Sequence, residues 1–226
     1  MKKIYLWMLA AIFACGITPA RAQLDQGTFS IIPRLGFLSS NLSQMPNLPI
    51  NDHIELKKTL FPGFLVGADV EYQFTDMFSV AAGLNYTCQG GKWKNYSIPR
   101  YELKDIQMVL GYLNLPVVAN VYLFDGFALK AGVQLSLLTN ADSEYKLITH
   151  NANGTIDSDK YDESIRSDCN KLDFSIPVGL SYEFSEQLII DARYHLGLIR
   201  LNKEKDPDEN PCNRAFVVTV GYRFPL

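Results

Sequence analysis

Large apolar residues recur at every second position along most of this chain. In the segment 172–184 every even-numbered residue is large and apolar, whereas the odd-numbered ones include Asp173 and Glu183. A period of two places alternate residues on opposite faces of a β-strand. Eight segments show this alternation, and a helical apolar period is not evident in any segment. The predicted strands are residues 28–40, 60–74, 78–89, 109–124, 127–139, 172–184, 187–200 and 214–224.

The connections between these strands alternate strictly between short and long. The short ones are residues 75–77, 125–126 and 185–186, and Asp125-Gly126 is a strong hairpin signal. The long polar ones are predicted as loops at about 41–59, 90–108, 140–171 and 201–213. An up-and-down meander with this spacing has all short turns at one end and all long loops at the other. Such a meander can close into a barrel without exposed edges.

The alternation leaves open which face lies inside. A soluble lipocalin-like cup has an apolar interior, whereas an outer-membrane barrel has an apolar outside and a polar interior. The small and polar face carries charges of both signs and many glycines, which suits a narrow interior that side chains must fill and neutralise. We therefore predict a filled barrel without an open diffusion channel. The predicted interior charges are Arg34, Asp69, Glu71, Lys130, Asp173, Glu183, Asp191, Arg193 and Arg223.

Aromatic residues gather on the apolar face near the short turns. They are Tyr72, Phe74, Phe78, Phe127, Tyr182, Phe184, Tyr222 and Phe224. A girdle of this kind is typical of a membrane interface, and strands of about ten residues cross a bilayer when tilted. We predict an all-β fold: an eight-stranded antiparallel up-and-down transmembrane β-barrel. The last strand should pair with the first, and Arg223 should point inward toward Glu71 or Glu183.

The N-terminal residues have a different composition. Lys2 and Lys3 precede a short apolar run, and Ala20-Arg21-Ala22 fits a small-x-small cleavage pattern. We therefore predict a signal peptide over residues 1–22 and an outer membrane β-barrel domain over residues 23–226. The alternative is cleavage at Cys15, because the residues before it loosely resemble a lipoprotein signal.

The charge and the cysteines narrow the function classes. Without residues 1–22 the chain has 18 basic and 24 acidic side chains, a net charge of −6, which disfavours nucleic acid as a partner. The remaining cysteines are Cys88, Cys169 and Cys212, and their spacing does not suggest a zinc site. Cys169 and Cys212 fall in long loops at the same predicted end. A disulfide between them is our hypothesis, because an exported protein meets an oxidising environment.

Two groups of residues are candidates for chemistry. His195, near Asp191 and Arg193, could act as a base in an outer-membrane hydrolase, but no nucleophile motif accompanies it. We therefore interpret it as a hydrogen-bonded interior histidine, and we interpret His53 and His150 as solvated loop residues. Oxygen ligands for Ca²⁺ are plentiful in the longest loop, yet their spacing does not match an EF-hand. We predict no catalytic, metal or cofactor site. The loop acids are Asp157, Asp159, Asp162, Glu163 and Asp168.

Six short stretches in the predicted strands stand out by their order and spacing: 33–37 (PRLGF), 61–64 (FPGF), 112–117 (YLNLPV), 129–132 (LKAG), 191–198 (DARYHLGL) and 220–224 (VGYRF). Together they resemble the PorT-like outer-membrane β-barrel family of Gram-negative bacteria. The resemblance covers roughly residues 23–226 and implies an eight-stranded outer-membrane barrel. Some members support export through a type IX secretion apparatus. The chain departs from the family pattern by ending in Pro225-Leu226 after the aromatic Phe224.

The predicted function is a non-enzymatic structural or secretion-accessory role in the bacterial outer membrane, to which a signal peptide would export the chain. The expected partners are outer membrane lipid, the barrel-assembly machinery and secretion-apparatus proteins, with no cofactor. The alternatives are an outer membrane hydrolase and a soluble lipocalin-like ligand-binding barrel.

Overall fold

The computed structural model describes residues 26–43, 57–98, 100–124, 126–151, 155–184, 187–203 and 211–226, so the predicted signal peptide, Cys15 and His53 lie outside the described residues. The named elements of the described residues are all strands, and among these residues no helix is long and apolar enough to cross a bilayer. The strands are β1 (Phe29–Leu42), β2 (Lys58–Thr59), β3 (Phe61–Thr75), β4 (Phe78–Trp93), β5 (Tyr96–Ile98), β6 (Tyr101–Phe124), β7 (Phe127–His150), β8 (Ile156–Ser164), β9 (Leu172–Phe184), β10 (Leu188–Arg200), β11 (Cys212–Tyr222) and β12 (Phe224–Pro225).

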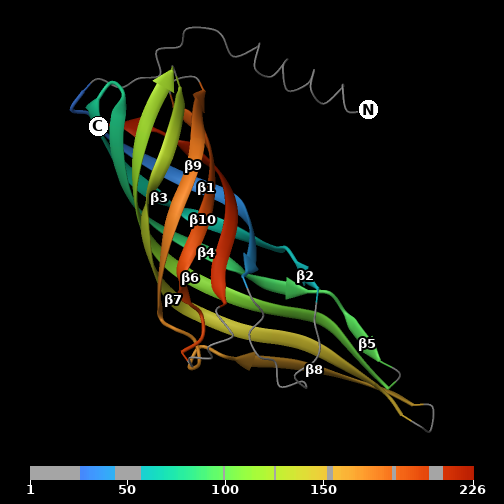
Figure 1. The fold of residues 1–226 in the computed structure, drawn as a ribbon. Coiled ribbons are helices and arrows are strands. Elements are labelled where there is room, and N and C mark those ends of the chain that lie inside the picture. Colours follow the sequence, from blue (N-terminus) through green and yellow to red (C-terminus); the bar gives the residue numbers. More distant parts are fainter. Residues whose placement is uncertain are drawn as a thin grey trace, which may run out of the picture.

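Eight of these strands form a closed antiparallel ring in the order β1-β3-β4-β6-β7-β9-β10-β11. The ring closes between the first and last strands, where Leu35 lies opposite Val220 and Phe37 opposite Val218. Figure 1 shows the strands tilted around a common axis. The predicted eight-stranded barrel and the predicted pairing of its first and last strands are confirmed.

The apolar face of the ring points outward. In β1, Leu35 is 63% exposed and Phe37 is 80% exposed, whereas Arg34 between neighbouring apolar positions is 5% exposed. The same alternation runs through the other ring strands. A continuous band of exposed aliphatic and aromatic side chains would be unfavourable in water but is suited to lipid. The apolar interior of a lipocalin-like cup is therefore not what this chain forms.

Aromatic rings on the outer surface contact one another near the short turns. The ring centroids of Tyr222 and Phe224 are 4.7 Å apart, and those of Phe29 and Tyr72 are 4.6 Å apart. Phe29, the first residue of β1, joins this group because it lies directly opposite Tyr72 of β3.

The chain end continues the barrel wall. In β12, Phe224 pairs with Ile31 and Pro225 with Ser30, in the register set by β11. The Leu226 N–H then donates a hydrogen bond of 2.8 Å to the Phe29 carbonyl oxygen. The two residues after Phe224 therefore extend the final strand and do not leave the sheet.

Two of the predicted long loops are wrong, because much of them is sheet. β6 and β7 each have 24 residues and run past the barrel, where β5 pairs with β6 and β8 pairs with β7. Figure 1 shows these four strands projecting at the loop end. Register shifts lie between Lys104 and Gln107 and between Gly111 and Tyr112, and Asp105 has φ 52°. Bulges of this kind break the alternation, so a strict period of two stops short of the real strand ends.

Candidate functional site: the charged interior and its apolar cap

An ion-pair cluster centred on Asp191 occupies the barrel interior. The Asp191 carboxylate lies 2.7 Å from Lys130 Nζ and 2.8 Å from Arg193 Nη2. Arg34 Nε lies 2.6 Å from Asp69 Oδ2, and Arg34 Nη1 lies 3.4 Å from Asp191 Oδ2. All five side chains are buried. Because water does not solvate them, each charge depends on its partners for stabilisation.

A second cluster, nearer the short turns, is built around Arg223. Its Nε and Nη2 donate to the two carboxylate oxygens of Glu183 at 2.9 and 3.0 Å, and its Nη1 lies 3.2 Å from Glu71 Oε1. The hydroxyls of Tyr122 and Ser79 donate to the same Glu71 oxygen at 2.7 and 2.8 Å. A two-bond arginine–carboxylate contact is one of the stronger polar interactions in proteins. Arg223 therefore points inward and pairs with both of the acids named from the sequence.

The two clusters balance one another in charge. The Asp191 cluster has three cations and two anions, and the Arg223 cluster has one cation and two anions. Four positive and four negative charges therefore share the interior. The ninth predicted charge, Asp173, is also buried but lies in a polar section nearer the loops. Its Oδ2 accepts a 2.7 Å hydrogen bond from Asn213 Nδ2, which also contacts the Tyr112 hydroxyl at 3.0 Å.

Gly83 makes room for the Asp69–Arg34 pair. It lies directly opposite Asp69 on the neighbouring strand, and a Cβ at this position would lie 2.0 Å from Asp69 Oδ1. Side chains on directly opposed residues point to the same face of a sheet. The absence of a side chain at Gly83 therefore leaves the space that the Asp69 carboxylate occupies.

Replacing Gly83 with alanine should lower the free energy of unfolding by about 1–3 kcal/mol, because the new methyl group must displace a buried, paired carboxylate. Urea unfolding of the protein in lipid vesicles measures this change. The folded fraction is monitored on a gel of unheated samples as the band of the compact barrel. Gly221→Ala is the matched control. The nearest atoms to a Cβ there would be side-chain carbons of Ile32 and Arg34 at 3.0 and 3.2 Å and the Pro33 carbonyl oxygen at 3.2 Å. None is as close as the 2.0 Å contact at Gly83, so a smaller loss is expected. An equal effect of the two substitutions would contradict the role given to Gly83.

A small cavity of about 10 Å³ lies beside the Asp191 cluster, which is room for roughly one water molecule. His195 lines it, and its Nε2 is buried without a hydrogen-bond partner among the described residues. Among the described residues no hydroxyl nucleophile contacts this ring nitrogen. The structure thus places His195 inside the barrel, as interpreted from the sequence, but its Nε2 does not make the hydrogen bond that we expected.

The other candidate residues lie in the projecting sheet. His150 Nε2 lies 3.2 Å from Glu102 Oε1, so His150 is a strand residue that contacts an acid. Hydrogen bonds from Lys104 and then His150 lower the pKa of Glu102. Four of the five loop acids fall on β8. Within the described ranges, no group of three or more His, Cys, Asp or Glu side chains is arranged to hold a metal ion.

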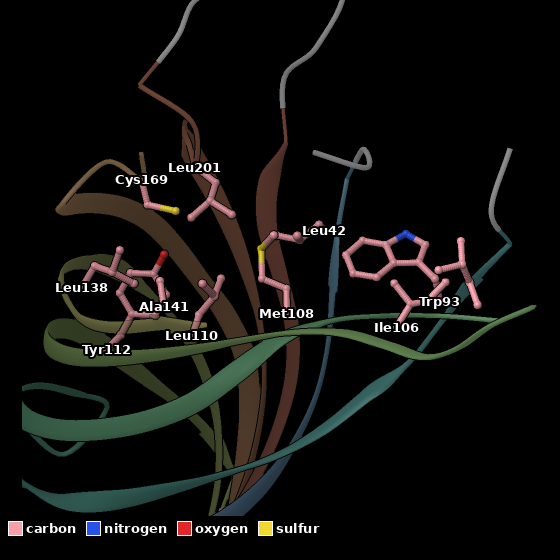
Figure 2. Packing of buried hydrophobic residues seen from close by; sticks show 11 residues of the cluster. Leu42, Trp93, Ile106, Met108, Leu110, Tyr112, Leu138, Ala141, Cys169 and Leu201 are labelled. Carbon is pink, nitrogen blue, oxygen red and sulfur yellow. The ribbon is translucent and has the colours of Figure 1, made fainter. Parts of the chain in front are cut away.

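An apolar cluster covers the polar interior at the loop end. Figure 2 shows its side chains converging from several strands above the barrel. We call this cluster the apolar cap. Its buried members are Leu42, Trp93, Leu103, Ile106, Met108, Leu110, Tyr112, Leu138, Ala141, Cys169 and Leu201. The cap was not predicted. Its signal was present in Ile106 and Met108, which continue the inward-facing series of β6 from Leu110 into a segment assigned to a loop.

Cys169 belongs to this cap and carries a free thiol in the structure. Burial, followed by the negative charge of Asp168, raises the pKa of Cys169 to about 11. A thiol with a raised pKa and little exposure reacts slowly. Cys212 opens β11 at the same end of the molecule. The Cys169–Cys212 disulfide stays a prediction.

Comparisons with known proteins identify a family and several similar structures. A family model described as outer membrane protein beta-barrel domain matches residues 21–202. Among curated proteins no match is found. Similar solved structures include Ail, the attachment invasion locus protein of Yersinia pestis (15% identity, 88% of this chain and 100% of that chain, TM-score 0.45). They also include OprG from Pseudomonas aeruginosa (14%, 91% and 99%, 0.43) and Neisserial surface protein A (14%, 86% and 95%, 0.41).

The family model spans seven of the eight ring strands, and the structure adds β11 as the strand that closes the ring. The apolar outer face, the charged interior and the closed ring are the features that a bilayer-spanning β-structure requires. The chain therefore belongs to the outer membrane protein beta-barrel domain family, and it is a β-barrel of the bacterial outer membrane.

Proposed function

We propose that this protein is a non-enzymatic outer-membrane barrel that presents its projecting sheet to the exterior as an accessory of protein secretion. The filled interior indicates that this role does not include conducting solutes through the barrel. Two ion-pair clusters and the apolar cap follow one another along the barrel axis, and the cavity among them holds about 10 Å³. A solute would have to break several buried ion pairs to pass. The PorT-like sequence stretches support the secretion role.

The projecting sheet supports an outward-facing function. The barrel itself is complete at eight strands, so β5, β8 and the distal halves of β6 and β7 are not needed to close it. Long connections of outer-membrane barrels lie on the extracellular side. Surfaces displayed on a rigid scaffold in this way are where binding functions usually occur.

A deletion strain tests this proposal. Loss of the chain should lower the amount of exported protein in the culture medium several-fold, and the wild-type chain should restore it. Purified protein in planar bilayers should give no single-channel steps. An unchanged set of exported proteins would contradict the secretion role, and stable conductance steps would contradict the filled interior.

One variant distinguishes the proposed non-enzymatic role from the alternative, an outer membrane hydrolase. His195→Gln keeps a polar interior side chain but removes any general base at this position. We expect it to complement the deletion as well as the wild type does. Failure to complement, with normal amounts of folded barrel in the membrane, would favour the hydrolase.

A further inference from the structure

The strand β8 has one edge without a strand partner among the described residues. All of β8 pairs with β7, from Ile156 opposite His150 to Ser164 opposite Asp142. It pairs with no other described strand. Figure 1 shows β8 at the margin of the projecting sheet, next to β7. All of its residues except Tyr161 are exposed. An exposed strand edge offers a row of backbone donors and acceptors to another chain.

The ladder between β7 and β8 shows which backbone groups are available. The Asn151 N–H donates to the Thr155 carbonyl, and the Ile165 N–H donates to the Ala141 carbonyl. At both ends of the ladder, therefore, the odd-numbered residues form the hydrogen-bonded pairs with β7. Along an antiparallel ladder hydrogen-bonded and non-hydrogen-bonded pairs alternate, so the even-numbered residues do not bond to β7 through their backbone. The N–H and C=O groups of the even-numbered residues Ser158, Lys160 and Asp162 therefore point away from β7, toward the unpaired edge.

Four of the five charged side chains on β8 are acidic, and the exception is Lys160. On the face shared with Tyr161, three acids follow at alternating positions: Asp157, Asp159 and Glu163. Tyr161 itself stacks on Tyr145 of β7, with ring centroids 4.8 Å apart and planes within 13°. This cross-strand pair fixes the facing of β8, so the acids on either side of it share one face.

This arrangement selects the occupant of the edge. A second copy of β8 would place acids near acids, and like charges facing one another across strands are destabilising. An extended segment with lysine or arginine at alternating positions would place each cation next to an acid, while its backbone completes the ladder. We propose that the β8 edge binds an extended, basic polypeptide segment by strand addition.

The proposal deepens the proposed function, because it names the chemistry of a partner for the projecting sheet. It is nevertheless tested by binding alone, so the secretion role can fail while strand addition holds. The probe is a fluorescent eleven-residue peptide with lysine at alternating positions and threonine or valine between them. Fluorescence anisotropy with the full chain in lipid nanodiscs measures the dissociation constant. We expect saturable binding that weakens with added salt.

One variant separates backbone pairing from charge. Ser158→Pro removes an N–H that points to the open edge, leaves the β7 ladder intact and does not change the charge. We expect it to weaken binding about tenfold, because at least one backbone hydrogen bond is lost and the ring obstructs the edge. Ser158→Ala is the matched control, since it keeps the N–H, and it should bind like the wild type.

A second pair of variants tests the choice of a basic partner. The triple substitution Asp157→Asn, Asp159→Asn and Glu163→Gln should weaken binding about tenfold and remove most of its salt dependence. The control Asp105→Asn, Asp142→Asn and Glu144→Gln changes the charge equally away from the acidic face and should have little effect.

Three results would overturn the proposal. Ser158→Pro could bind as tightly as Ser158→Ala, which would indicate charge attraction without strand addition. A peptide of otherwise the same composition that carries two prolines could bind equally well, which would likewise indicate charge attraction without strand addition. The chain could instead dimerise through β8, in which case Ser158→Pro would abolish a dimer seen in the absence of peptide. The compact gel band of each variant establishes that the barrel is folded.

Discussion

Replacing Asp191 with asparagine should lower the free energy of unfolding by about 3–5 kcal/mol. The Asp191 carboxylate is within ion-pair distance of Lys130, Arg193 and Arg34. Without it, Asp69 is the one carboxylate left in this cluster for three buried cations, and it pairs with Arg34 and Arg193. Removing one partner of a buried pair is more costly than the pair is favourable, because the remaining charges have lost their compensation and have no water. Urea unfolding in lipid vesicles measures the change.

Two further variants show whether the loss comes from charge. Asp173→Asn also removes a buried interior acid, but this acid has a hydrogen bond from Asn213 and no ion pair among the described residues. We expect it to cost only about 1–2 kcal/mol. Adding Lys130→Met to Asp191→Asn removes the cation whose ion-pair partner is Asp191, and part of the lost stability should return. Equal stability of Asp191→Asn and the wild type would contradict the central role of this carboxylate.

Replacing Arg223 with methionine should have an effect of the same size, about 3–5 kcal/mol, for the opposite reason. Arg223 is the cation that lies between Glu71 and Glu183, and its side chain is among the largest that are fully buried. Methionine fills much of the same volume without a charge. The two carboxylates would then face each other inside the barrel without their ion-pair partner, and Glu71 would keep its hydrogen bonds from the Tyr122 and Ser79 hydroxyls.

Neutralising the two acids should restore much of this loss. In the triple variant Arg223→Met, Glu71→Gln, Glu183→Gln no unpaired charge remains, and uncharged interiors of similar volume are often as stable as ion pairs. The urea midpoint and the fraction of compact barrel on an unheated gel give both quantities. If the triple variant is no more stable than Arg223→Met, the effect of Arg223 arises from packing and not from charge pairing.

The sequence alone determined the ring strands and the facing of their side chains. Because side chains alternate with a period of two, each strand can face the barrel interior in only two ways. The surrounding lipid favours the one that places the apolar side chains outside. For this reason Arg34, Lys130 and Arg223 could be assigned to the interior from their positions between apolar neighbours. The short turns and the closing pair of strands followed from the spacing of the same segments.

The projecting sheet and the cap could not be derived in this way. Beyond the membrane the outer face of β6 and β7 meets water, so Lys104 and Lys146 stand where apolar residues would stand in the barrel. The bulge near Asp105 also shifts the alternation of β6 by one residue, so odd-numbered and even-numbered side chains change faces there. Alternation then no longer separates strand from loop, and only the pairing of β5 and β8 with their neighbours defines the sheet.

The sequence by itself therefore determined which residues enter the barrel, and only the tertiary structure decided which of them meet. Asp191 lies 157 residues from Arg34, yet the ring brings the two within 3.4 Å because the first and last strands close on each other. Interior side chains from different strands meet at heights set by strand tilt and register. Those quantities depend on the closure of the whole ring, and no single strand encodes them.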